Sequence, residues 1–273
     1  MKKIIAIMAI LLAAVSCGQR TPAQKALVLY YSQSANTQAV AEQIAALTGA
    51  DIEAFVLEEP YDGTYQQTIE RSGRERQEGI LPVVNPVKAD LDAYDVIYLG
   101  YPIWFGTYAP PIAAWLDQVD LSGKKIVPFC TFGSGGLDAS INDLKAKQPK
   151  AEVLPGYGVR AARLEAMPEE VEFFLKANGL IKGDFTPLED FSAPHPVSEA
   201  ETIIFDEAVG TYPMINAQAV TAATRAIPGG TEYLFTAVDK PREGMPAMPA
   251  GAQMKVYVTA LDGQLADFTQ VVR

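Results

Sequence analysis

A run of small polar residues separates a predicted strand from a predicted helix near the start of the chain. The stretch reads YYSQSANTQAVAEQIA, Tyr30 to Ala45, and it continues the apolar run Ala26 to Tyr31. Free N–H groups and the positive dipole end at a helix N-terminus favour an anion, and side-chain hydroxyls add further donors. Capping of the helix by its own side chains explains the same pattern without a ligand. The candidate anion-binding residues are Ser32, Ser34, Ala35, Asn36 and Thr37.

This candidate anion site has no cation near it in the sequence. No Lys or Arg occurs between Lys25 and Arg71. A nucleoside triphosphatase loop needs Gly-Lys-Ser/Thr, and a dinucleotide site needs three spaced glycines. The segment has neither pattern, so a single phosphate monoester held by uncharged donors fits best.

Two later segments follow predicted strands in the same way. GYPIWFGTYAPP follows the third strand and CTFGSGG follows the fourth. In an open parallel sheet, ligands bind outside the carboxyl ends of the strands, where the strand order reverses. Trp104 and Phe105 can cover a flat aromatic ligand by stacking, and glycines let a backbone approach a ring closely. A core aromatic or a plain turn explains each segment alone, but the three together indicate a binding site.

These three segments resemble the loops of the flavodoxin family over about residues 26–180. The resemblance implies a doubly wound α/β fold with a parallel five-stranded sheet in the order 2-1-3-4-5, and non-covalent FMN. The anion is then the FMN phosphate. The second loop would flank the isoalloxazine through Pro102, Ile103, Trp104, Phe105 and Gly106. The third loop would meet the polar edge of the ring through Thr131, Phe132, Gly133, Ser134 and Gly135.

Two residues depart from the flavodoxin pattern. Ala35 stands where the phosphate loop usually has Gly, so a positive φ there would be strained. Phe132 stands where relatives often have a small or polar residue. Either departure could weaken FMN binding or alter the redox potential.

The hydrophobic pattern predicts alternating strands and helices, which favours a parallel sheet covered on both faces. Strands are predicted at about 26–31, 51–57, 96–101, 125–131 and 151–159, and helices at about 37–47, 66–78, 109–118, 138–147 and 168–177. The resulting domain covers 26–183, and the Pro-rich and acidic segment 184–198 is predicted to be a linker. Residues 199–273 are predicted to form a smaller α+β antiparallel domain that loosely resembles the cystatin-like fold.

The first residues of the chain predict an export signal followed by a lipid anchor. Lys2 and Lys3 precede the apolar stretch 4–15, and AAVSCG resembles the bacterial lipobox. We therefore predict a lipoprotein signal at 1–17, lipidation of Cys17 and a tether at 18–25. An ordinary signal peptide with an incidental Cys17 is the alternative. The predicted location is extracytoplasmic, at a membrane surface, with the lipid as the only membrane contact.

Charge and composition disfavour several classes of partner and of catalytic site. The chain of 273 residues has a formal net charge of −11, which disfavours nucleic acid and anionic membrane partners. One histidine, His195, and one spare cysteine, Cys130, cannot build a zinc site or a Ser-His-Asp centre from the usual parts. His195 is predicted to be solvated in the linker and Cys130 to be a buried small hydrophobe. Arg71, Arg74 and Arg76 are predicted to form a solvated helix face, or to bring one arginine to the flavin edge.

Two functions follow from these observations. The first is an FMN-binding redox protein, either an electron carrier or a small-quinone reductase outside the cytoplasm. Its partners would be a redox protein or a quinone-like small molecule. The alternative is a surface-anchored binding module, in which the flavodoxin-like core is a scaffold with a weak or lost flavin site.

Overall fold

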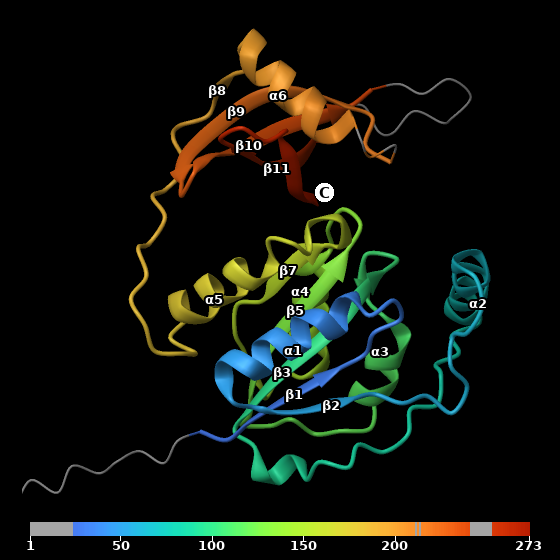
Figure 1. The fold of residues 1–273 in the computed structure, drawn as a ribbon. Coiled ribbons are helices and arrows are strands. Elements are labelled where there is room, and N and C mark those ends of the chain that lie inside the picture. Colours follow the sequence, from blue (N-terminus) through green and yellow to red (C-terminus); the bar gives the residue numbers. More distant parts are fainter. Residues whose placement is uncertain (1–23, 211, 213, 241–252) are drawn as a thin grey trace, which may run out of the picture.

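The computed structural model describes residues 24–210, 212, 214–240 and 253–273 (Figure 1). They form an α/β domain followed by a smaller domain with an antiparallel sheet. The predicted signal, lipidation site and most of the tether, residues 1–23, lie outside the described residues. Within the described ranges, no helix is both long enough and apolar enough to cross a membrane.

The first domain is built on a parallel sheet. Its strands are β1 (Ala26–Tyr30), β2 (Asp51–Ala54), β3 (Val96–Trp104), β5 (Lys125–Phe132), β6 (Glu152–Val153) and β7 (Tyr157–Arg160). They pair in the order β2-β1-β3-β5, and both β6 and β7 pair with β5. Because β6 and β7 occupy the place of the fifth predicted strand, the order 2-1-3-4-5 is confirmed. A short strand, β4 (Thr107–Tyr108), turns back antiparallel on β3.

The fifth strand is split in two beside Pro128, which lies in the middle of β5. Ile126 pairs with Val153, and Phe129 pairs with Tyr157, so one extra residue sits between the two pairs on the outer strand. Proline has no N–H to donate to a ladder. The interruption on β6–β7 therefore lies beside the residue of β5 that cannot donate.

Helices cover both faces of this sheet (Figure 1). They are α1 (Asn36–Thr48), α3 (Pro110–Leu116), α4 (Leu137–Lys147) and α5 (Met167–Ala177), with 3-10 turns at Leu91–Ala93 and Ala161–Arg163. Alternate residues of β1 enter opposite layers, since Val28 packs with α1 and α5 while Leu29 packs with α3 and α4. The prediction of a sheet buried on both faces is confirmed.

Helix α2 (Tyr65–Glu78) lies apart from these two layers, at the side of the domain (Figure 1). It begins with a capping box, in which Thr64 accepts from the Gln67 N–H and the Gln67 side chain accepts from the Thr64 N–H. Only Thr68, Ser72 and Glu75 of this helix are buried. Its side chains contact loops at the end of the sheet, since Arg71 donates to the Pro60 carbonyl and Arg76 donates to the Phe105 carbonyl.

The C-terminal domain is an antiparallel sheet with one helix on it. The elements are β8 (His195–Pro196), α6 (Glu199–Gly210), β9 (Ala217–Ile227), β10 (Gly230–Asp239), β11 (Gln253–Leu261) and β12 (Asp267–Val272). The strands pair in the order β12-β11-β10-β9-β8, and Phe205 of α6 packs 5.2 Å from Phe235 of β10 between ring centroids. Because β8 is part of this sheet, the C-terminal sheet begins inside the segment predicted to be a linker. The relation to the cystatin-like fold stays a prediction.

His195 was expected to be solvated, and its side chain is 44% exposed, but it also has a partner that the sequence did not indicate. Its ring Nε2 lies 2.8 Å from Oε1 of Glu201, whose other oxygen accepts from the Ser198 N–H and hydroxyl. The bond to Glu201 raises the pKa of His195 above 6.5. The Ser198 N–H is the main cause that lowers the pKa of Glu201. The pair thus links β8 to the start of α6.

We expect the stabilising effect of this pair to depend on pH. A raised histidine pKa contributes stability that is complete below about 6.5 and is lost as pH rises through the folded-state value. The lowered Glu201 pKa removes its own contribution only under more acidic conditions. His195→Gln should therefore lower the melting temperature more at about pH 6 than at about pH 8.5. Equal losses at both pH values would contradict a charged pair.

Candidate functional site

The first loop presents free hydrogen-bond donors at the N-terminus of α1. Its N-cap residue is Ala35, which has φ 62° and makes no side-chain capping hydrogen bond. In the described part of the chain, the amide groups of Asn36 and Thr37 have no hydrogen-bond acceptor. The Ser32 hydroxyl accepts weakly from the Gln38 N–H at 3.3 Å. Neither Ser34 nor Asn36 therefore caps the helix with its side chain, and the backbone N–H groups of Asn36 and Thr37 are available to an anion.

The nearest cations in the sequence are held by other partners. Lys25 pairs with Asp51 at 3.4 Å, at the opposite end of β1 from the loop. Arg71 donates to Glu75 at 2.8 Å and to the carbonyl groups of Pro60 and Glu59. The free donors at the α1 N-terminus are thus uncharged.

A buried hydrogen bond ties the first loop to the end of β5. The hydroxyl oxygens of Thr37 and Thr131 lie 2.8 Å apart, and the two residues are 1% and 4% exposed. The sequence reasoning gave both side chains to the ligand. The structure instead joins them to each other, so these two hydroxyls position the loops.

The second loop is a tight hairpin between β3 and β4. Phe105 and Gly106 form its tip with φ values of 51° and 87°, and Phe105 is 48% exposed. A bulky residue with positive φ is uncommon and favours a functional reason for the conformation. Pro102 and Ile103 before the tip are half-buried, and the Pro102 carbonyl accepts from the Ala109 N–H at 3.1 Å.

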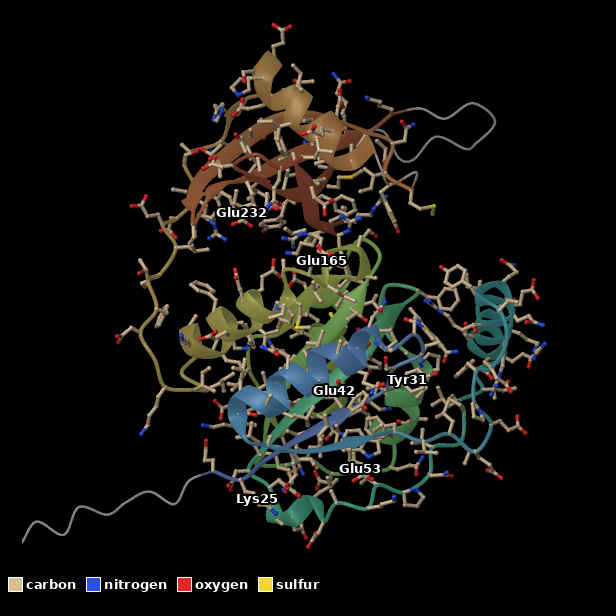
Figure 2. All side chains as sticks on the ribbon, viewed as in Figure 1. Lys25, Tyr31, Glu42, Glu53, Glu165 and Glu232 are labelled. Carbon is tan, nitrogen blue, oxygen red and sulfur yellow. The ribbon has the colours of Figure 1, made fainter. Side chains whose placement is uncertain are left out.

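Trp104 packs between two tyrosines rather than standing free. Its ring meets Tyr31, which follows β1 (Figure 2), at 6.0 Å and Tyr61 at 5.1 Å between centroids, both edge to face. The Tyr61 hydroxyl donates to Glu75 at 2.5 Å, and Arg71 lies 4.2 Å above the Tyr61 ring. Burial and the bond to Glu75 raise the pKa of Tyr61, which keeps it protonated. Helix α2 therefore braces the second loop through this cluster.

The prediction of a solvated arginine face on α2 is wrong for Arg71 and confirmed for Arg74 and Arg76, which are both exposed. Arg71 is half-buried in the cluster just described. Arg76 donates to the Phe105 carbonyl at 3.1 Å, and its guanidinium carbon lies 5.4 Å from the centre of the Phe105 ring. Arg74 is exposed, as predicted. One of the arginines does reach the second loop.

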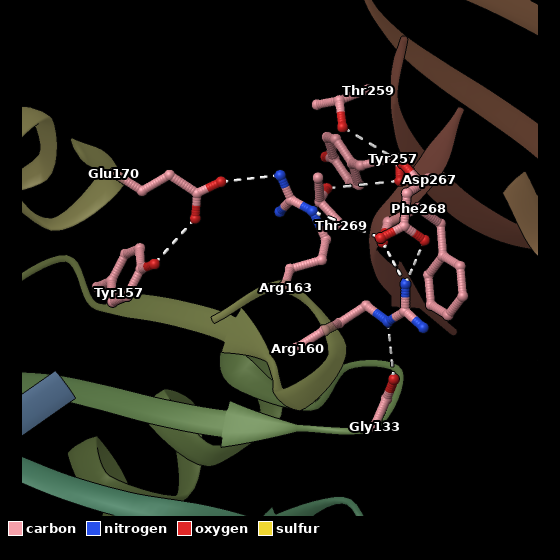
Figure 3. A network of polar contacts seen from close by, with 10 residues as sticks. All are labelled: Gly133, Tyr157, Arg160, Arg163, Glu170, Tyr257, Thr259, Asp267, Phe268 and Thr269. Carbon is pink, nitrogen blue, oxygen red and sulfur yellow. Dashed lines mark hydrogen bonds and ion pairs between the residues drawn. The ribbon is translucent and has the colours of Figure 1, made fainter. Parts of the chain in front are cut away.

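The third loop contacts both the second loop and the C-terminal domain. A Cβ atom on Gly136 would lie 2.6 Å from Cγ2 of Ile103, so the second and third loops touch. The Gly133 carbonyl accepts from Arg160 at 3.0 Å (Figure 3), and the Ser134 carbonyl accepts from the Val271 N–H at 2.6 Å. Phe132, which precedes the loop, is 5% exposed and packs in the core. Its side chain therefore belongs to the core and not to an open site.

The three loops thus converge at one edge of the sheet. Tyr31 and Trp104 join the first loop to the second, Ile103 and Gly136 join the second to the third, and the two threonines join the first to the end of β5. The sequence reasoning missed Tyr61 and Glu75, which only the folded chain brings to Trp104. It also missed Arg160, whose position at the carboxyl end of a predicted strand was the available signal.

Cys130 takes no part in this convergence. It is fully buried and free, and burial raises the pKa of its thiol. The prediction of a small buried hydrophobe is confirmed.

The chain belongs to the flavodoxin family. The model of a family described as Flavodoxin matches residues 25–170, which include all three loops. A protein of Gluconacetobacter diazotrophicus named NAD(P)H dehydrogenase (quinone) is 34% identical over 95 residues, which are 34% of this chain and 46% of that protein. The chain therefore spans about half the length of the curated relative that it matches.

Solved structures resemble the first domain. A crystal structure of a candidate flavoprotein from Bacteroides eggerthii has 25% identity and a TM-score of 0.51, and covers 57% of this chain and 99% of that one. A Lactobacillus acidophilus flavoprotein in complex with FMN has 25% identity and a TM-score of 0.46, and covers 50% of this chain and 93% of that one. Both likenesses cover only about the length of the first domain.

We expect Ala35→Gly to stabilise the protein. Ala in the left-handed region costs about 1–2 kcal/mol, whereas Gly adopts it freely, and the greater freedom of Gly in the unfolded chain offsets about 0.4–1 kcal/mol. The free energy of unfolding should rise by about 0.5–1 kcal/mol. The matched control is Ala39→Gly, inside α1, which should lower it by about 1 kcal/mol. Urea unfolding measures both, and a loss at Ala35 as large as at Ala39 would contradict the strained conformation.

Proposed function

We propose that the protein binds FMN where its three loops converge, and passes electrons to a quinone-like small molecule or a redox partner protein. FMN is the cofactor of the flavodoxin family, to which the chain belongs. The observation that carries the proposal is the set of free, uncharged donors at the N-terminus of α1. Bound FMN would supply one- or two-electron chemistry, and the protein would supply its orientation and electrostatics.

The first loop fits a phosphate dianion. The free N–H groups of Asn36 and Thr37 stand at the positive end of α1, and the Ser32 and Ser34 hydroxyls can donate beside them. The left-handed conformation of Ala35 gives the loop its shape. These residues would hold the phosphate without any lysine or arginine.

The second loop fits the isoalloxazine ring. Phe105 has an exposed ring at the hairpin tip, and Arg76 fixes the tip through the Phe105 carbonyl. Trp104 beside it is held edge to face by two tyrosines, so its own ring is preorganised. Phe105 is therefore the side chain that we assign to stacking, with Trp104 as its support.

A quinone-like acceptor is supported by the name of the curated relative, NAD(P)H dehydrogenase (quinone). In addition to the proposed FMN site, the sequence shows no nucleotide-binding fingerprint of the three-glycine type. We therefore favour an electron donor other than a nicotinamide bound by this chain. A reduced quinol or another redox protein would serve.

The test is an FMN titration of the purified protein, followed by anaerobic reduction and mixing with a water-soluble benzoquinone. The wild-type protein should turn yellow, and its reduced form should be reoxidised by the quinone. Phe105→Ala should weaken FMN binding by about 1–3 kcal/mol, the scale for loss of one stacked aromatic side chain. Phe173→Ala, a partly exposed aromatic residue on α5, is the control and should change nothing.

Two results would count against this proposal. A wild-type protein that stays colourless after incubation with FMN would leave the core as a scaffold, and would favour the alternative of a surface binding module. Equal affinity in wild type and Phe105→Ala would place the ring elsewhere.

We also propose that the protein is anchored outside the cytoplasm by lipid on Cys17. The support is the lipobox-like AAVSCG after a basic and apolar start, together with the polar tether that follows. Two acyl chains hold a protein firmly at a membrane, whereas one chain binds only marginally. Electron donors would then be membrane quinols or extracytoplasmic carriers, and FMN would have to be delivered across the membrane.

Cys17→Ser should abolish lipidation. The variant should move from the membrane fraction to the soluble fraction, or keep its signal uncut. Fractionation of cells followed by mass spectrometry of the N-terminal peptide measures both outcomes. A wild-type N-terminal peptide that carries no lipid, or a Cys17→Ser variant whose signal is cut but which still fractionates with membranes, would rule out the anchor.

A further inference from the structure

The C-terminal domain touches the first domain at the third loop, which is the loop that would meet the polar edge of FMN. We propose that this domain completes the flavin site by holding the third loop, with Arg160 and Asp267 as positioning residues. The inference rests on the proposed function. It assigns to residues 199–273 a role in setting flavin affinity and redox potential.

Arg160 is a buried link between the two domains (Figure 3). Its side chain is 5% exposed, and its Nε donates to the Gly133 carbonyl at 3.0 Å. Its Nη1 donates to the Asp267 carboxylate at 2.6 Å and to the Phe268 carbonyl at 2.8 Å. Leaving a buried guanidinium without partners is strongly destabilising, so these contacts hold the loop and β12 together.

The backbone of β12 also meets the loop directly. The Val271 N–H donates to the Ser134 carbonyl at 2.6 Å. A Cβ atom on Gly135 would lie only 2.1 Å from the Val271 carbonyl oxygen. The approach of the C-terminal domain is therefore possible only because residue 135 has no side chain.

These contacts orient the peptide groups of the third loop. The Gly133 carbonyl accepts a hydrogen bond from the Arg160 side chain, and the Ser134 carbonyl accepts one from the Val271 N–H. Both donors lie at the contact between the two domains. In a trans peptide, the N–H of the next residue points the opposite way. The N–H groups of Ser134 and Gly135 thus point away from these partners, and neither has an acceptor within the described residues. Both stay available as donors.

Oriented donors of this kind suit the polar edge of a flavin. That edge carries carbonyl oxygens and a ring nitrogen, and hydrogen bonds to the ring tune its electronics. The reduced ring is richer in electrons, so it gains more from the donors than the oxidised ring does. By binding the Ser134 carbonyl directly, and by holding Arg160 against the Gly133 carbonyl through Asp267 and Phe268, the C-terminal domain should raise both FMN affinity and the redox potential.

The test measures FMN dissociation constants and the two-electron midpoint potential in variants of the full chain. Gly135→Ala forces the loop and Val271 apart, and Asp267→Asn removes the charge that faces Arg160. Each should raise the dissociation constant for oxidised FMN about tenfold, the scale for losing one or two hydrogen bonds. Each should also lower the potential by about 30 mV, which corresponds to a further tenfold loss for reduced FMN. Thermal unfolding of the apo-protein checks that each variant is folded.

Two control variants separate positioning from general damage. Gly210→Ala makes the same substitution in α6, where a Cβ atom meets nothing within 4 Å, and it should match the wild type. Asp267→Glu keeps the charge and should restore much of the affinity lost in Asp267→Asn. If Asp267→Asn does not fold, Gly135→Ala decides the question, since it leaves the charge pair in place.

The outcomes distinguish this inference from the proposed function. A folded Gly135→Ala with wild-type affinity and potential would overturn the inference while the proposed function stands. A wild-type protein that binds no FMN would overturn both. A loss of affinity as large in Gly210→Ala as in Gly135→Ala would also overturn the inference.

Discussion

The reversal of strand order at β1 is the constraint on which the site depends. Strand β1 lies between β2 and β3, so the chain leaves β1 toward one side of the sheet and the later strands are added on the other. Loops on the two sides then diverge at the carboxyl edge and leave room for a ligand. The Thr37–Thr131 hydrogen bond and the Tyr31–Trp104 contact hold that edge together. The helix N-terminus, the hairpin tip and the glycine loop consequently face one region.

The donors that this edge offers to the proposed phosphate are uncharged. A phosphate dianion at the N-terminus of α1 would interact with backbone N–H groups and the helix dipole, each of modest strength, and with serine hydroxyls. Arg71, the first cation after Lys25 in the sequence, is bonded to Glu75 and lies over the Tyr61 ring, which packs against Trp104. In the proposed site, Arg71 would thus support the wall, and the backbone would bind the anion.

Local signals explain what the sequence predicted well. The strands and helices of the first domain follow from short apolar runs and helical spacing, and the strained φ of Ala35 follows from a loop that favours Gly. Other features depend on contacts between distant residues. Arg160 and Asp267 are 107 residues apart, and nothing local marks them as partners. Likewise, β8 lies in a Pro-rich segment that reads as a linker, because its pairing with β9 is visible only in the fold.

The most direct measurement is a crystal structure of the full chain grown with FMN. The account predicts the phosphate at the N-terminus of α1, within hydrogen-bond distance of the Asn36 and Thr37 amides. It also predicts the ring between Phe105 and the third loop, with the Ser134 and Gly135 amides on its polar edge and β12 still bound to the Ser134 carbonyl. A phosphate held by arginine or lysine side chains, or a ring bound away from these loops, would contradict it.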